Sequence, residues 1–124
     1  MTVRRAFIIG GSITSFIGKG HPDFIWKRHP EFGTRENPSL FDYLTNAVKA
    51  AFETTGVTGA DVDKAYVSNF AGELFCNQGH LGAALIGADS GLQYKPSMRI
   101  EGACDSGGLA FAAGLDSIRA GSDI

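Results

Sequence analysis

The pattern of apolar and polar positions is most regular between residues 39 and 56, in the sequence SLFDYLTNAVKAAFETTG. Apolar side chains recur there three or four positions apart, which predicts a helix with one apolar face, formed by Leu40, Phe41, Leu44, Val48, Ala51 and Phe52. Ser39 and Asp42 have the spacing of a capping box, and Pro38 prevents the helix from extending upstream. Gly56 is expected to end it.

Three short runs rich in β-branched and aromatic residues predict strands at 4–9, 65–70 and 96–103. Two further helices are expected at 78–88, in a glycine-containing stretch, and at 104–120, where Gly121 would be the stop. The resulting order is β-α-β-α-β-α. Such an order predicts an α/β fold with a mainly parallel sheet and helices on its faces.

The last predicted helix has no charged residue between Ser106 and Leu115. A helix that is apolar on all sides is normally buried on all sides, and six elements in one layer cannot cover it. Additional polypeptide is therefore expected to pack against this helix. The sequence ends in the polar turn GSDI, where another strand would be expected, so the chain is predicted to stop in mid-fold.

A long segment without periodicity, residues 12–38, contains many Gly, Pro, His and aromatic residues and is predicted to be a loop. Loops of this length in compact domains usually have a function or form an interface. Trp26, Phe24 and Phe32 within it predict either a small satellite core or a contact with another subunit.

Composition narrows the class of protein. The 124 residues are enough for one small domain, and with 44% apolar and 19% charged residues they predict a soluble globular chain. The net charge of −2 and the lack of a basic stripe argue against binding to nucleic acid or to an anionic membrane. The apolar run near the N-terminus is too short for a signal peptide or a membrane span. A cytoplasmic, reducing setting with free thiols is therefore expected.

Cys104 lies at the corner between the predicted strand 96–103 and the helix that follows it. Unpaired N–H groups and the dipole at a helix N-terminus would stabilise a thiolate and a developing oxyanion there. Ser106, Gly107 and Gly108 would let a substrate approach the sulfur. A small packed core residue is an equally good interpretation of this position. No second Cys or His has the spacing of a metal site, so no metal is expected.

Three segments resemble the thiolase superfamily. RIEGACDSGGLAFAAGLDSIRAGSD is similar to the nucleophilic-cysteine segment of that family, E-x-A-C-[AG]-S-G-x-x-A. VSNFAGELFCNQGHLGAAL resembles the preceding segment of thiolases related to the sterol-carrier-protein type and of their archaeal and bacterial relatives, among them archaeal acetyl-CoA acetyltransferases. The opening AFIIGGSITSFIGKG is also similar, so the resemblance covers nearly the whole chain. The related ketosynthases have a pattern closer to C-S-S-S.

The resemblance implies a thiolase-like fold. Each half of a thiolase is β-α-β-α-β-α-β-β, and the third helices of the two halves are sandwiched between sheets. Residues 1–124 would then be the N-terminal part of the first domain, an incomplete half that ends before its last two strands and contains a buried third helix.

The resemblance also implies a reaction. The residue that matches Cys104 attacks an acyl-CoA thioester and holds the acyl group covalently. Either Claisen condensation or thiolytic cleavage of a 3-oxoacyl-CoA follows, with coenzyme A as a cosubstrate and no covalently bound cofactor. The family's activating histidine and most CoA contacts belong to the later half. His21, His29 and His80 are not substitutes for it, so this chain alone is expected to be inactive.

Partners are implied in the same way. A homo-oligomer is expected, together with the remainder of the thiolase chain, and a small partner protein with a zinc ribbon and an OB-fold is one possibility. A thiolase-fold subunit with a binding or structural role and no turnover is the alternative function. A free-standing flavodoxin-like domain is a third hypothesis, against which the uncharged last helix argues.

Position 105 departs from the family pattern, because it is Asp where the family usually has a small residue. Its carboxylate would either disfavour a neighbouring thiolate by repulsion or point away and favour the start of the helix.

Overall fold

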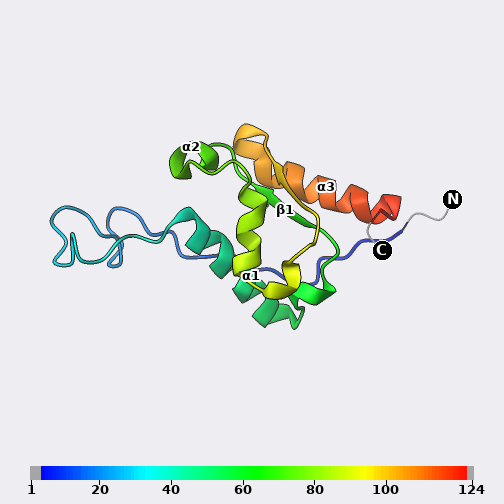
Figure 1. Cartoon of the computed structure of the whole chain (residues 1–124), viewed down its shortest axis with the longest axis horizontal. Helices are drawn as coiled ribbons and strands as arrows, with labels where there is room; N and C mark the ends of the chain where they lie inside the picture. Colours follow the sequence, from blue (N-terminus) through cyan, green and yellow to red (C-terminus); the bar gives the residue numbers. More distant parts are fainter. Residues whose placement is uncertain (1–3, 123–124) are drawn as a thin grey trace.

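The computed structural model describes residues 4–122 and confirms an α/β fold (Figure 1). Strands β1 (Ala65–Ser68) and β2 (Ser97–Ile100) form a parallel two-stranded sheet in which Ala65 lies opposite Ser97. The α-helices are α1 (Leu40–Thr55), α2 (Gly72–Cys76) and α3 (Ser106–Ala120). Four short 3-10 helices complete the structure: η1 (Gly59–Asp61), η2 (Leu81–Gly87), η3 (Ser90–Leu92) and η4 (Ala103–Asp105). No helix within residues 4–122 combines the length and apolar character needed to cross a membrane.

Helix α1 begins and ends where the sequence predicts. The Ser39 hydroxyl accepts the Asp42 N–H at 3.2 Å, and the Asp42 carboxylate accepts the Ser39 N–H at 2.8 Å, which completes the capping box. Gly56 ends the helix with a φ of 72°, a left-handed conformation in which its N–H donates to the carbonyl of Phe52. Both ends depend on residues close in the chain, which is why the sequence pattern identified them.

The core lies on one face of the sheet, between the strands, α1 and η2. Its buried members are Val67, Leu81, Leu85 and Leu92. The alternation of a strand sends Tyr66 to the opposite face, where its hydroxyl lies 2.6 Å from Ser117 Oγ of α3. The two faces therefore hold different elements, α1 and η2 on one side and α3 on the other, as Figure 1 shows.

The predicted strand at 4–9 is wrong for the described chain. This segment has no strand assignment, and Phe7, Ile8 and Ile9 are each more than 70% exposed. A strand needs a neighbour with which to exchange hydrogen bonds, and β1 and β2 are paired only with each other. The segment lies along α3 instead, with Ala6, Phe7 and Ile8 facing the helix across a groove.

The predicted helix at 78–88 is also wrong in type. Helix α2 ends at Cys76, because Asn77 adopts a left-handed φ of 50°, and the chain then continues as the 3-10 helix η2. Gly82 packs so closely on Ser97 that a Cβ atom would collide with the Ser97 hydroxyl. A residue with a side chain would therefore not fit at position 82 without a shift of Ser97.

The predicted burial of the third helix is not met within residues 4–122. Ser106 is the buried residue of α3, whereas Leu109, Phe111 and Ile118 are 43%, 61% and 41% exposed. Strands β1 and β2 cover one side of the helix. Between its other apolar side chains and segment 4–8 runs an open groove of about 410 Å³. No described element fills that groove.

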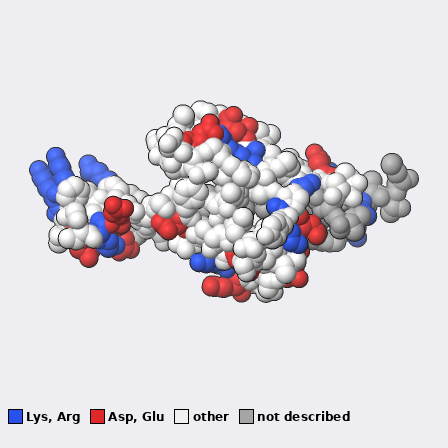
Figure 2. All heavy atoms as spheres, in the orientation of Figure 1, with Lys and Arg blue, Asp and Glu red and all other residues white. Residues whose placement is uncertain are grey.

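Residues 18–38, here called the arm, extend from the body as a loop, as predicted (Figure 1). Ile25 is buried inside the arm, and its backbone N–H and carbonyl are both bonded at 2.8 Å by the Asn37 side chain. Trp26 and Phe32 are exposed, so they do not form the predicted satellite core. Basic side chains gather at the outer end of the arm (Figure 2).

Candidate active site

Cys104 lies where the sequence placed it, at the corner between β2 and α3, in the turn η4. It is an exposed free cysteine, and α3 begins shortly after it at Ser106. Its exposure in this chain argues against a small packed core residue. In parallel sheets, ligands bind at the carboxyl ends of the strands, and Cys104 follows that end of β2.

The backbone immediately before Cys104 has an unusual conformation. Ala103 has a φ of 50°, a left-handed value that costs a residue with a Cβ atom about 1–3 kcal/mol. Two hydrogen bonds to side chains hold it there. The Ala103 N–H donates to Glu101 Oε1 at 2.9 Å, and the Ala103 carbonyl accepts the Ser106 hydroxyl at 2.7 Å. Strained residues of this kind cluster at functional sites.

Two acidic residues, Glu101 and Asp105, lie close to the cysteine in the chain. The Glu101 carboxylate is bonded to the Ala103 N–H. The Asp105 carboxylate lies over the first turn of α3, where a Cβ atom on Gly108 would come within 3.1 Å of Asp105 Cγ. This position is the one expected if Asp105 favours the start of the helix.

Close packing explains why a glycine, Gly102, follows the end of β2. A Cβ atom on Gly102 would collide with the tip of the Leu109 side chain, so Gly102 allows the first two turns of α3 to fold back against the end of β2. The short distance between strand end and helix leaves Cys104 at the surface of a tight corner.

Arg99 of β2 joins the ends of the two strands. Its guanidinium donates to the carbonyls of Asn69 at 3.2 Å and Phe70 at 2.9 Å and forms an ion pair with Glu73 of α2. The Asn69 N–H in turn donates to the carbonyl of Ile100 at 3.3 Å. The sequence contained no signal for this role, because the partners of Arg99 are 26 to 30 positions away.

A groove of about 460 Å³ opens at the same end of the sheet. Apolar and aromatic side chains from α1, α2 and the connection after β1 line most of it, namely Leu40, Tyr43, Phe70, Ala71 and Phe75, with Asn69 and Gly72. The groove is open to solvent and lies beside the carboxyl end of β1.

Cys76 ends helix α2, and His80 directly precedes η2. Cys76 is a half-buried free thiol whose Sγ donates to the carbonyl of Gly72 at 2.9 Å, and it packs against the core. His80 is an exposed residue directly before η2.

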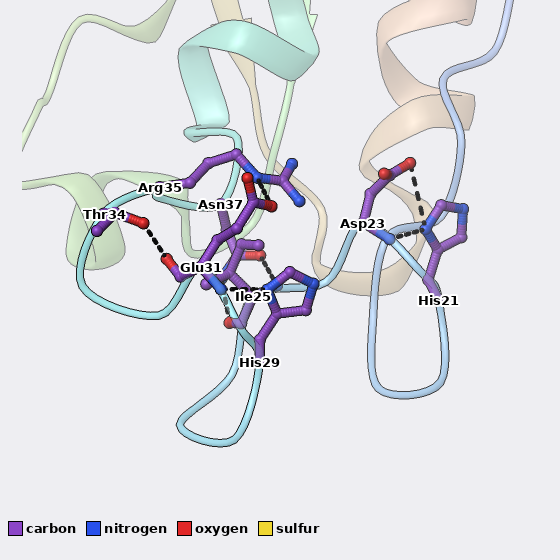
Figure 3. Close-up of polar contacts among 8 residues, drawn as sticks. All are labelled: His21, Asp23, Ile25, His29, Glu31, Thr34, Arg35 and Asn37. Carbon is purple, nitrogen blue, oxygen red and sulfur yellow. Dashed lines mark hydrogen bonds and ion pairs between the residues drawn. The ribbon is translucent and has the colours of Figure 1, made fainter.

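His21 and His29 lie in the arm, in two turns of the same design (Figure 3). In each turn the sequence is His-Pro-acid-Phe, and the histidine Nδ1 accepts the N–H two positions on, that of Asp23 or Glu31, at 3.1 Å. The repeat was visible in the sequence. These two hydrogen bonds stabilise the turns of the arm.

Comparison with known proteins identifies the family. The thiolase N-terminal domain matches residues 30–123. The chain belongs to the thiolase family. It is 43% identical to the acetyl-CoA acetyltransferase of Methanothermobacter thermautotrophicus over 83 residues. These residues make up 67% of this chain and 21% of that protein. It is 38% identical over 87 residues to the acetyl-CoA acetyltransferase of Methanocaldococcus jannaschii, 69% of this chain and 22% of the relative.

The match defines how much of a thiolase is present. The chain spans about a fifth of the length of these two relatives. The matched region includes α1, both strands, Cys104 and α3 of this thiolase chain, but omits segment 4–9 and most of the arm. Within residues 4–122 no three His, Cys, Asp or Glu side chains converge to hold a metal ion.

Proposed function

We propose that this chain is the nucleophile-bearing part of a thiolase-type acyltransferase that acts on acyl-CoA, with Cys104 as the nucleophile. The observation that supports the proposal most directly is the exposed thiol at a strained corner between β2 and the first turn of α3. Family membership and relatives named acetyl-CoA acetyltransferase support the class of reaction.

In the proposed reaction, the acyl group is held on the Cys104 sulfur between two transfer steps. The Cys104 thiolate forms a bond to the acyl carbon of an acyl-CoA, and the tetrahedral oxyanion collapses as the bond to the CoA sulfur breaks. CoA leaves as its thiolate and takes up a proton. In condensation, a base removes an α-proton from a second acyl-CoA, the resulting carbanion bonds to the acyl carbon, and the bond to the Cys104 sulfur breaks and returns the thiolate. In thiolysis, the thiolate instead attacks the 3-oxo carbon of a 3-oxoacyl-CoA, the C2–C3 bond breaks, and the carbanion of the shorter acyl-CoA takes up a proton. The sulfur of a free CoA then bonds to the acyl carbon as the bond to Cys104 breaks.

The first turn of α3 supports the oxyanion stage. Unpaired N–H groups at the start of a helix attract negative charge, and the Cys104 N–H lies in the turn that leads into that helix. The groove lined by Leu40, Tyr43 and Phe75 opens at the same end of the sheet and suits an acyl or pantetheine chain. The base that activates the thiol is expected outside residues 1–124, so we propose that this chain alone is inactive.

We propose that further thiolase polypeptide covers α3 and segment 4–8, because their facing apolar side chains leave an open groove of about 410 Å³. Residues 1–124 would then be the N-terminal part of a thiolase N-terminal domain that lacks its last two strands. We also propose a cytoplasmic homo-oligomer, with a zinc-ribbon and OB-fold protein as one possible partner. Native mass spectrometry tests the covering polypeptide, the homo-oligomer and the partner protein: a lone 13.1 kDa species would contradict all three.

The proposed nucleophile is tested in the complete assembly, meaning this chain with every polypeptide that co-purifies with it. The assembly is incubated with acetyl-CoA, and peptide mass spectrometry locates the acetyl group. The adduct is expected on Cys104, and it should be lost in Cys104→Ala and nearly lost in Cys104→Ser, because a hydroxyl is a far weaker nucleophile. Cys76→Ala is the matched control and should form the adduct normally. A folded assembly that forms no adduct would indicate the non-catalytic subunit instead.

A further inference from the structure

Ser106, the first residue of α3, is the only buried polar residue within residues 4–122, with 6% of its surface exposed. Its hydroxyl makes two hydrogen bonds to the backbone before Cys104. It accepts the Gly102 N–H at 3.0 Å and donates to the Ala103 carbonyl at 2.7 Å. One buried side chain thus connects the start of the helix to both residues that precede the cysteine.

We propose that Ser106 is a positioning residue for Cys104. Its hydroxyl holds Ala103 in the left-handed conformation and thereby sets where the Cys104 sulfur lies relative to the first turn of α3. This inference rests on the proposed function, in which Cys104 attacks an acyl-CoA.

The hydrogen bonds separate this role from ordinary helix capping. Asp105 is the N-cap residue of α3, and its side chain makes no capping hydrogen bond. The Ser106 hydroxyl is directed away from the helix, to residues 102 and 103, so its bonds restrain the corner and not the helical N–H groups.

Loss of the Ser106 hydroxyl would remove one of the hydrogen bonds that restrain Ala103 in its left-handed conformation. The Gly102 N–H would lose its Ser106 partner, whereas the Ala103 carbonyl would keep the Ser106 backbone N–H. The other side-chain restraint on Ala103 is the bond to Glu101, an exposed residue. An alanine released from the left-handed conformation relaxes toward negative φ, because its Cβ atom clashes with the backbone at positive φ. The relaxation rotates the following peptide and moves Cys104.

The test measures two reactions of Cys104 in the complete assembly. In Ser106→Ala, acetylation by acetyl-CoA should slow about 100-fold, because attack on a carbonyl requires alignment of the sulfur with the thioester. Alkylation by iodoacetamide should change by about threefold or less, because a small alkylating reagent needs an accessible thiolate only. Ser106→Thr keeps the hydroxyl and should acetylate at near the wild-type rate.

Glycine at position 103 should restore acetylation in Ser106→Ala if strain at that position is what displaces Cys104. Glycine adopts positive φ without a Cβ clash. Ala103→Gly in the Ser106→Ala background should therefore recover at least about tenfold of the lost acetylation rate, since the corner no longer has to be held against strain. The alkylation rate of Cys76 in the same samples reports the integrity of the fold.

The outcomes separate the two proposals. Wild-type acetylation in Ser106→Ala would overturn the positioning role and leave the proposed function intact. A parallel loss of acetylation and of Cys104 alkylation, with faster Cys76 alkylation, would show a structural role and overturn it as well. Absence of acetylation in the wild-type protein, with normal alkylation, would overturn the proposed function and the positioning role together.

Discussion

Replacement of Leu81 with alanine tests whether the core described above holds the sheet together. Leu81 has no exposed surface, and its helix η2 packs on α1 and on both strands. The change removes about three CH₂ equivalents at ~0.8 kcal/mol each, or ~2.4 kcal/mol of transfer free energy. The cavity left behind adds to this loss, so we expect the free energy of unfolding to fall by about 3–4 kcal/mol.

The matched control is Leu74→Ala in α2, because Leu74 is 81% exposed. Its removal should change the free energy of unfolding by less than about 0.5 kcal/mol. Urea unfolding curves followed by far-UV circular dichroism measure both variants, and an unchanged slope would show that only stability has changed. If Leu81→Ala destabilised the protein no more than Leu74→Ala, the assignment of Leu81 to the centre of the core would be refuted.

Three further predictions follow from the capping boxes and the clamp at the strand ends. Ser39→Ala should lower the free energy of unfolding by about 1 kcal/mol, measured by urea unfolding, because it removes the N-cap of α1. Hydrogen bonds from Ser39 and Thr58 lower the pKa of Asp42 and of Asp61 below the ordinary 3.8. As the pH falls, the carboxylates are therefore protonated in the unfolded chain before they are protonated in the folded one. The stability that these groups contribute is retained above about pH 4 and declines below it. Asp42→Asn should weaken that decline in unfolding curves recorded at low pH. Arg99→Lys removes the planar fork that spans two carbonyls and a carboxylate, so amide hydrogens of α2 should exchange faster while those of α1 stay unchanged.

Sequence reasoning succeeded where structure depends on near neighbours. The ends of α1 were readable because Ser39, Asp42 and Gly56 act within one turn of the helix. The corner at Cys104 was readable for a similar reason, since a β-type run passes directly into a helix-forming run. The twin turns of the arm were equally local, but their His-Pro-acid-Phe repeat was overlooked.

The prediction failed where the conformation depends on what a segment meets in space. Residues 4–9 have the composition of a strand, but within residues 4–122 they meet α3 instead of a strand edge. The stretch 78–88 has the apolar residues of a helix, but it forms the tighter helix η2, in which Gly82 packs against Ser97 of β2. The uncharged surface of α3 predicts a buried helix, but Leu109, Phe111 and Ile118 are exposed within residues 4–122.

The sequence by itself determined the α/β class, the limits of α1 and the place of Cys104 between strand and helix. Side-chain pattern and capping chemistry act over a few residues, and the linear order preserves them. Only the tertiary structure decided the pairing of β1 with β2, the Arg99 clamp and the left-handed Ala103 held by Ser106. Pairing and clamp join residues about 30 positions apart, and the strain at Ala103 exists only because packing and hydrogen bonds oppose its relaxation.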